Sequence, residues 1–252
     1  MDFGLKGKNA LVTGSTKGMG KAIAEILAAE GANVIVTGRS LDEAKAVADA
    51  INEGEGGKAT AISADLSRPG AADDLFDQSV EALGSLDILV NNAGVWPSAY
   101  VREMELDAFT DTLYLNLEVP FLLCKKMVNH LIEDGRKGKI VNMVSVAAFQ
   151  GSTTGHAHYA SSKAGLKTFT VSLAREVAGY GINVNAVAPG MVETPMTAKA
   201  LETRRDYYNG RIPIGKVAQP EEVAYPVVYL CSDKADYLTG LTLDATGGML
   251  MR

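Results

Sequence analysis

The stretch Asn9-Ala-Leu-Val-Thr-Gly14-Ser-Thr-Lys-Gly18-Met-Gly20 joins a short apolar run to a glycine-rich loop. Residues 9–13 predict a strand, and residues 21–29 predict a helix because their apolar positions recur at helical spacing. A strand, a glycine loop and a helix N-terminus together favour a phosphate site, since exposed N–H groups and the helix dipole face the anion. The spacing GxxxGxG differs from the usual GxGxxG, and a tight turn can require glycine without any ligand. Other motifs must decide between these two interpretations.

A second strand, 33–37, follows this helix and completes a βαβ unit. NAD-binding units carry an acidic residue near the end of this strand, where it holds the ribose 2′-hydroxyl. Here the segment reads Thr37-Gly38-Arg39-Ser40, without an acid. Arg39 can pair with a 2′-phosphate, and Lys17 in the glycine loop can reach the same group. Two solvated surface cations are the alternative, but their placement at both edges of one pocket predicts NADP as the cofactor, with NAD as the second choice.

The rest of the chain alternates helices and strands. Helices are expected at 41–52, 71–83, 109–131, 159–178 and 220–231, and strands at 58–63, 86–91, 139–144, 182–188 and 240–244. This alternation predicts an α/β fold with a parallel sheet covered on both faces. No repeat or linker divides the chain, so residues 1–252 are expected to form a single domain. Residues 191–212, broken by Pro195 and Gly210, are where a substrate lid is expected.

Composition excludes several classes of function. The 252 residues carry a net charge of −6, whereas a nucleic-acid-binding surface needs a basic stripe. Two cysteines and three histidines supply neither a disulfide framework nor a zinc site, which fits a reducing compartment. No run approaches the roughly 18 apolar residues of a membrane span, and the N-terminus lacks a signal core. We therefore expect a cytoplasmic protein with no metal, membrane or nucleic-acid partner.

Tyr159 and Lys163 form the first candidate catalytic pair. They lie four residues apart at the start of an expected helix, so their side chains leave one face. An ammonium near a phenol favours the phenolate and lowers the pKa of the tyrosine, which can then exchange a proton with a substrate oxygen. Ser145, at the end of the expected strand 139–144, can place a hydroxyl beside the same oxygen. A half-exposed surface pair is the alternative for an isolated YxxxK.

Two further polar features stand between apolar segments. The loop Asn91-Asn92-Ala93-Gly94 consists of small and polar residues that let the chain pass close to a flat ligand, although a structural turn explains them equally well. Asn116 lies among apolar residues of an expected helix and must find a polar partner there.

Taken together, these motifs resemble the short-chain dehydrogenase/reductase family. The resemblance extends from about Leu5 to Gly248 and rests on their order and spacing: Thr13-Gly14-Ser-Thr-Lys-Gly18-Met-Gly20, Asp65, Asn91-Asn92-Ala93-Gly94, Asn116, Ser145, Tyr159-Ala-Ser-Ser-Lys163 and Pro189-Gly190. It implies a single doubly wound, Rossmann-type sheet and an enzyme that interconverts an alcohol and a ketone by hydride transfer.

The resemblance also implies roles for residues. Asn116, Ser145, Tyr159 and Lys163 are the implied catalytic set: Tyr159 as general acid or base, Ser145 on the substrate oxygen, Lys163 on the nicotinamide ribose and Asn116 anchoring a water relay. The glycines would receive the pyrophosphate, Asp65 would face the adenine and Thr194 the carboxamide. The implied cofactor-binding residues are Gly14, Ser15, Lys17, Gly18, Met19, Gly20, Arg39, Asp65, Leu66, Asn92, Ala93, Gly94, Tyr159, Lys163, Pro189, Gly190, Val192 and Thr194.

Several residues depart from the family pattern. The segment between Ser145 and Tyr159 is one residue longer than expected, so His156 and His158 either line the substrate cleft or are surface histidines without a role. Trp96 either forms one wall of a substrate pocket or only packs against neighbouring residues. Two residues are inserted before Gly247-Gly248, in the C-terminal segment. In the family that this chain resembles, the C-terminal segment often packs across a tetramer axis. A homo-oligomer is expected, a tetramer first and a dimer as the alternative.

Bacterial 3-oxoacyl-carrier-protein reductases are especially similar. Arg136 stands where they use a basic residue to hold the carrier protein, but Tyr180 stands where a second is expected. The leading hypothesis is an NADP-dependent ketone reductase or secondary-alcohol dehydrogenase for small substrates. A polyol, sugar-acid or hydroxysteroid dehydrogenase working oxidatively is the second, and a non-catalytic cofactor-binding protein is the third. Arg204-Arg205 in the expected lid either attract an anionic substrate or merely solvate a helix face, and the second is favoured.

Overall fold

The computed structural model describes residues 2–152 and 154–251, which contain a seven-stranded parallel sheet. The strands are β1 (Asn9–Val12), β2 (Asn33–Gly38), β3 (Ala59–Ser63), β4 (Ile88–Asn91), β5 (Gly138–Met143), β6 (Ile182–Pro189) and β7 (Thr242–Ala245). Their order is β3-β2-β1-β4-β5-β6-β7, so the winding direction reverses between β1 and β4. Such a reversal opens a crevice at the carboxyl ends of the two strands, where doubly wound folds hold ligands. The prediction of a single doubly wound α/β sheet is confirmed.

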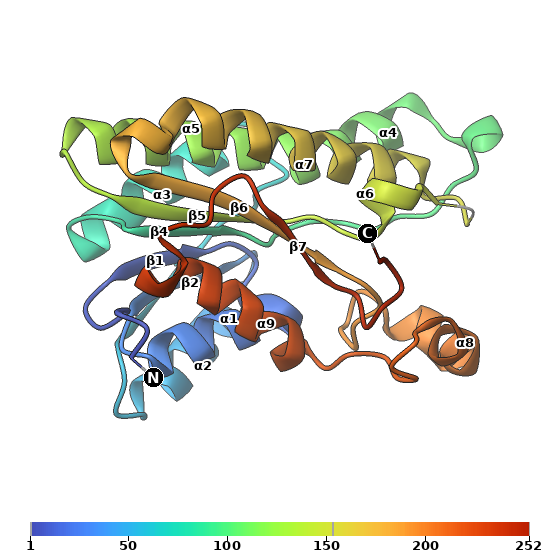
Figure 1. Cartoon of the computed structure of the whole chain (residues 1–252), viewed down its shortest axis with the longest axis horizontal. Coiled ribbons are helices and arrows are strands. Elements are labelled where there is room, and N and C mark those ends of the chain that lie inside the picture. The colour runs from blue at the N-terminus through green and yellow to red at the C-terminus, as the bar shows by residue number, and fades with distance from the viewer. Residues whose placement is uncertain (1, 153, 252) are drawn as a thin grey trace.

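Helices cover both faces of the sheet (Figure 1). One layer contains α1 (Gly18–Ala29), α2 (Leu41–Asn52) and α9 (Pro220–Cys231), whose apolar residues share one core with β1 and β2. The other layer contains α3 (Ala71–Leu83), α4 (Leu106–Leu113), α5 (Val119–Glu133) and α7 (Ala157–Val177). β4 and β5 are buried along their whole length. Burial on both faces is why these strands lack the strict alternation of apolar and polar residues that a half-exposed strand shows.

One expected helical region is present but irregular. The helix expected at 109–131 is divided into α4, a π-helical turn (Tyr114–Glu118) and α5. Pro120 lies in the first turn of α5, has no N–H to donate to the carbonyl four residues earlier, and its ring crowds that carbonyl. The carbonyl belongs to Asn116, which is fully buried at the centre of the π-helical turn. The irregular turn is therefore a local consequence of the proline.

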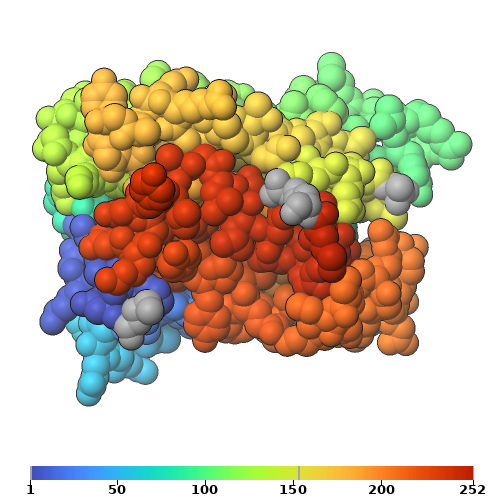
Figure 2. Space-filling view, viewed as in Figure 1, coloured from blue at the N-terminus to red at the C-terminus, as the bar shows by residue number. Residues whose placement is uncertain are grey.

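A small separate core lies at one end of the molecule. Helix α8 (Ala198–Arg211) buries only Leu201, which packs with Ile212 and Val217. The short helix α6 (Ala147–Gln150) follows β5. Figure 2 shows the orange α8 region at a corner of the molecule, next to the red C-terminal segment. Among the residues that the structure describes, no helix is both long and apolar enough to cross a membrane. The extent of a single domain over 1–252 stays a prediction.

Replacing Gly20 by alanine should destabilise the fold by about 1–3 kcal/mol, because overpacking a tight backbone contact forces the chain apart. An added Cβ would lie 2.3 Å from the Gly14 carbonyl oxygen and 2.5 Å from Asn92 Nδ2. Urea unfolding of Gly20→Ala measures the effect. The control Gly179→Ala meets nothing within 4 Å and should change stability by less than about 0.5 kcal/mol. Equal stabilities for the two variants would contradict the packing argument.

Candidate active site

The glycine loop leads from β1 into α1 and leaves the helix N-terminus open. Gly14 and Gly18 have left-handed φ angles of 64° and 57°, which side chains with a Cβ rarely adopt. Lys17, at the N-cap, makes no side-chain cap bond to the first turn. The N–H groups of that turn therefore have no capping side chain and face an anion-binding position.

The loop after β4 is bonded directly to the glycine loop. The Asn92 side-chain amide donates to the carbonyls of Thr13 (2.9 Å) and Gly14 (3.1 Å). In return, the Thr13 hydroxyl accepts from the backbone N–H groups of Asn92 (2.9 Å) and Ala93 (3.0 Å). A Cβ on Gly94 would lie 2.9 Å from Asn116 Oδ1 and 3.6 Å from Lys163 Nζ. The glycine loop and the expected catalytic residues therefore share one wall.

Other residues expected at the cofactor fall into two groups. Ser15 is turned into the protein: its hydroxyl donates to the Val12 carbonyl at 2.7 Å and accepts from the Thr37 N–H at 2.9 Å. This side chain shapes the loop and offers no free hydroxyl. Thr194, by contrast, lies across from the glycine loop, 3.3 Å from where a Cβ on Gly18 would be. A cavity beside the loop is lined by Met19, Pro189, Gly190, Val192 and Thr194.

Polar groups also gather at the ends of β2 and β3. Arg39 is exposed directly after β2, and its charge acts on Asp65, which follows β3. Hydrogen bonds from Ser67 are the main cause that lowers the pKa of Asp65, and the cations nearby add to them. Lys17 Nζ lies 3.3 Å from the Glu43 carboxylate. Of the two cations expected to bind a 2′-phosphate, Lys17 already has an acidic neighbour. Leu66, the neighbour of Asp65, is buried.

The four expected catalytic residues come from three elements and converge. Tyr159 lies in the first turn of α7 and Lys163 one turn later. Lys163 Nζ donates to the Met143 carbonyl at 2.8 Å and lies 5.9 Å from the centre of the Tyr159 ring. Ser145 follows β5, and its hydroxyl accepts from the Ala147 N–H at 3.2 Å.

Asn116 anchors the π-helical turn to the same region. Its side-chain oxygen accepts from the Val95 N–H at 2.9 Å, and its amide donates to the Val95 carbonyl (3.0 Å) and to the Ser162 hydroxyl (3.2 Å). The buried amide is thus satisfied by backbone and by α7. This arrangement fixes α7 next to the loop after β4.

The expected lowering of the tyrosine pKa is not what this arrangement produces. Burial raises the pKa of Tyr159, and the hydroxyl of Ser145 only partly offsets it. Burial also lowers the pKa of Lys163 to about 8. Because the ammonium is bonded to the Met143 carbonyl and not to the phenol, its field does not outweigh the loss of water around Tyr159. The phenol is therefore protonated at neutral pH.

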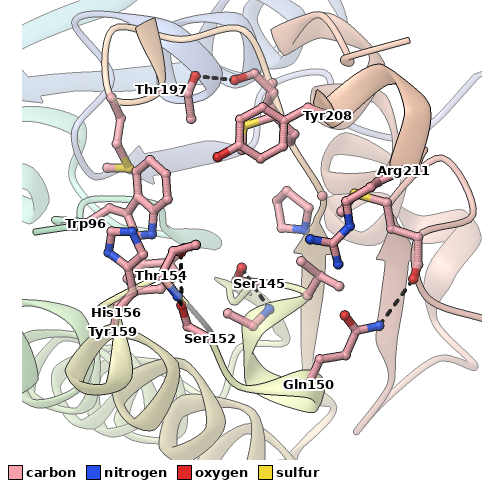
Figure 3. A pocket seen from close by; sticks show the side chains of 18 of the residues that line it. Trp96, Ser145, Gln150, Ser152, Thr154, His156, Tyr159, Thr197, Tyr208 and Arg211 are labelled. Carbon is pink, nitrogen blue, oxygen red and sulfur yellow. Dashed lines mark hydrogen bonds between the residues drawn. The ribbon is translucent and has the colours of Figure 1, made fainter. Parts of the chain in front are cut away.

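A cavity of about 380 Å³ contains Ser145 and Tyr159. Trp96 and His156 form one wall: their rings stack at 4.4 Å, and the Trp96 ring lies 6.5 Å from that of Tyr159. His156 Nδ1 is 2.7 Å from the Pro97 carbonyl. Figure 3 shows Arg211 and Gln150 on the opposite side, with Ser145 between the two sides. The structure thus places Trp96 and His156 in the wall of the cavity.

His158 differs from His156. It is fully buried, and neither ring nitrogen has a hydrogen-bond partner among the described residues. The alternative of two surface histidines is therefore wrong for both residues. Thr153, in the same long segment, lies outside the described residues. Sequence reasoning assigned no individual role to several cavity residues that have no motif of their own, among them Gln150, Thr197, Tyr207, Tyr208 and Arg211.

Comparisons with known proteins identify the family. The model of the family described as enoyl-(acyl carrier protein) reductase matches residues 14–250. A 3-oxoacyl-(acyl-carrier-protein) reductase of Aquifex aeolicus is 43% identical over 249 residues, covering 99% of this chain and 100% of the relative. A short-chain type dehydrogenase/reductase from Mycobacterium marinum has a solved structure with a TM-score of 0.94 and 32% identity, covering 100% of this chain and 98% of its own. The chain belongs to the short-chain dehydrogenase/reductase family. The prediction of an oxidoreductase of this family is confirmed.

A further relative was solved with a ligand. The crystal structure of a proposed NAD(P)-dependent gluconate 5-dehydrogenase from Beutenbergia cavernae holds NADP at low occupancy. It is 38% identical to this chain, covers 99% of both chains and has a TM-score of 0.93.

We expect acidification to destabilise the fold through His158. Burial first, and the neighbouring His156 second, lower the pKa of His158 below its ordinary value of 6.5. The unfolded chain therefore binds this proton more readily than the folded chain. The free energy of unfolding is unaffected well above pH 6.5 and falls as the pH drops through 6.5 toward the folded-state pKa.

Urea unfolding at about pH 7.5 and about pH 5.5 measures this dependence. The variant His158→Gln should lose less stability between the two pH values than the wild type. The control His130→Gln removes a histidine that lies 3.6 Å from Asp134. In this variant His158 is intact, so its contribution to the loss of stability at low pH should be that of the wild type. An unchanged pH dependence in His158→Gln would contradict this assignment.

Proposed function

We propose that this protein is an NADP(H)-dependent oxidoreductase that interconverts a ketone and a secondary alcohol by hydride transfer. The observation that carries the proposal is the shared cavity: Ser145 and Tyr159 line the same cavity as Met19, Gly190 and Thr194 beside the glycine loop. A dinucleotide on that loop would present its reactive end to the phenol. When bound, the nicotinamide supplies or accepts the hydride.

The residues of this chain would handle the proton and the substrate oxygen. Tyr159, protonated at neutral pH because burial raises its pKa, donates a proton to the carbonyl oxygen in reduction. Ser145 holds the same oxygen through its hydroxyl. Lys163 and Asn116 form the buried polar wall behind the phenol, where Lys163 would hold the nicotinamide ribose and Asn116 would anchor a water relay. Near neutral pH the phenol is in the protonated state that reduction needs, whereas oxidation would use the phenolate as base.

NADP fits the chain better than NAD. The glycine loop has no space for a Cβ at Gly20 and no side chain caps the helix N-terminus behind it, which suits the pyrophosphate of either dinucleotide, so the choice rests on the other end of the site. At the other end, Arg39 is exposed where a 2′-phosphate would lie, and no acid follows β2 directly. Relatives support this choice, because the structure from Beutenbergia cavernae was solved with NADP.

A carrier-protein substrate is the second candidate function. Relatives at 40% identity or more are named 3-oxoacyl-(acyl-carrier-protein) reductases. In this chain, however, Arg136 is bonded to the buried Asp87 at 2.6 Å, and Tyr180 occupies the other expected position. An arginine held by a buried carboxylate is less free to bind an acidic partner. Small substrates are therefore favoured. Comparing turnover of acyl-carrier-protein substrates and small ketones tests this choice.

Several other predictions stay open. A sugar-acid dehydrogenase working oxidatively keeps the same chemistry, and two similar structures are named for such reactions, gluconate 5-dehydrogenase and 2-deoxy-D-gluconate 3-dehydrogenase. The cytoplasmic location, the tetramer and the substrate lid at 191–212 stay predictions, and helix α8 supplies Tyr207, Tyr208 and Arg211 to the cavity.

Replacing Tyr159 by phenylalanine should reduce kcat for ketone reduction by about 10²- to 10⁴-fold, the usual contribution of a general acid. NADPH binding, followed by fluorescence titration, should survive, because the phenol is not needed to hold the pyrophosphate. The control Tyr180→Phe alters an exposed tyrosine and should retain wild-type kcat. Unchanged turnover in Tyr159→Phe would reject the proton-transfer role.

The variant Arg39→Asp should shift the ratio of kcat/KM for NADPH over NADH toward NADH by about tenfold or more, since it removes one charge-assisted contact. Initial rates with both cofactors measure the ratio. Lys45→Asp makes the same change of charge at an exposed position of α2 and should leave the ratio nearly unchanged. A preference that is equal in both variants would show that Arg39 does not contact the 2′-phosphate.

A further inference from the structure

We propose that Arg211 binds a carboxylate on the substrate, so that the natural substrate is a small oxo acid or the matching hydroxy acid. This proposal rests on the proposed function, because it concerns the substrate of the same cavity. One residue of α8, which lies outside the family motifs, would thus determine the class of substrate.

The charge of the cavity is the first observation. Among the described residues that line it, Arg211 alone carries a formal charge at neutral pH, and no aspartate or glutamate lies in the lining. No ion pair of Arg211 is found in the described part of the chain. In contrast, Arg205 on the same helix is bonded to Glu193 at 2.7 Å. Arg211 is an exposed residue of the cavity wall, and a guanidinium without a carboxylate partner at that wall attracts an anion.

The way Arg211 is held is the second observation. Its Nη1 donates to the Tyr207 hydroxyl at 2.7 Å, and its guanidinium lies 5.5 Å from the centre of the Tyr207 ring. These contacts orient the side chain and use only one of its donors. The Arg204 guanidinium also lies 5.5 Å from the same ring, so the Tyr207 ring has two cationic neighbours.

The position of Arg211 is the third observation. Figure 3 shows Arg211 opposite the stacked Trp96 and His156, with Ser145 between them. A substrate oxygen held at Ser145 would leave one end of the molecule facing Arg211 and the other facing the aromatic wall. Part of the cavity of about 380 Å³ lies beside the glycine loop and would take the nicotinamide end, so the space that remains suits a small molecule. The planar guanidinium matches a carboxylate through paired hydrogen bonds.

The test compares acids with their neutral esters, using NADPH as the reductant. The probes are 4-oxopentanoate, 5-oxohexanoate and their methyl esters, which differ within each pair by the charge and one methyl group. The variants are Arg211→Gln and the control Lys199→Gln. Lys199 is exposed on the same helix and does not line the cavity, so its replacement changes the charge of α8 equally.

We expect the wild type to prefer at least one acid over its ester in kcat/KM. Arg211→Gln should lose about 10- to 100-fold in kcat/KM on that acid, as for a lost charge-assisted bond, and change little on the ester. Lys199→Gln should behave as the wild type. Equal use of acid and ester by the wild type, or equal losses on both in Arg211→Gln, would overturn the proposal while leaving the reductase activity established.

A binding measurement separates this proposal from the proposed function. If no probe is reduced, the proposed ketone reduction fails for these substrates, but 4-oxopentanoate can still bind. Its effect on the thermal unfolding of the NADPH-loaded protein should then be larger in the wild type and Lys199→Gln than in Arg211→Gln. Equal shifts in the wild type and Arg211→Gln would overturn the carboxylate site.

Discussion

The bond network between Thr13 and Asn92 is the constraint on which the candidate site depends. It joins the ends of β1 and β4, the two strands between which the sheet reverses its winding direction. One side chain amide thereby fixes the shape of the glycine loop and the path of the chain toward Gly94, Asn116 and Lys163. A reversal in a parallel sheet creates a crevice. These hydrogen bonds give that crevice a defined wall. Within it, the backbone of the glycine loop and the expected catalytic side chains are held at a fixed distance from each other.

The same wall contains two groups that are costly to bury. Lys163 is 5% exposed and Asn116 is fully buried, and each is held by a backbone carbonyl: Met143 for the ammonium and Val95 for the amide. Burying polar groups costs stability unless hydrogen bonds replace water. Here the π-helical turn, which follows from Pro120, brings Asn116 to the loop after β4. A local irregularity of the helix and the polar wall of the site therefore have one origin.

The sequence predicted the architecture well because each element had a local signal. Residues 41–52 and 220–231 match α2 and α9 at both ends, since Ser40 caps the first and Pro220 begins the second. The π-helical turn was missed because apolar periodicity does not report the register of backbone hydrogen bonds. The pKa of Tyr159 was predicted in the wrong direction, since spacing brings two side chains near but does not show how much water surrounds them. Arg211 was missed because it reaches the cavity only through the way α8 folds back over the sheet. The sequence of this segment has no strand pattern from which that path could be predicted.

The separation of Leu201, Ile212 and Val217 from the two large cores has an evolutionary consequence. Packing energy in a protein is shared only among residues in contact, so substitutions in α8 are only weakly coupled to the sheet. The segment that supplies Tyr207, Tyr208 and Arg211 can then change with little effect on the packing of the glycine loop and the catalytic residues. Such a division lets one scaffold acquire new substrates through a few exchanges in a single segment. For protein engineering, it makes α8 the natural place to build a library.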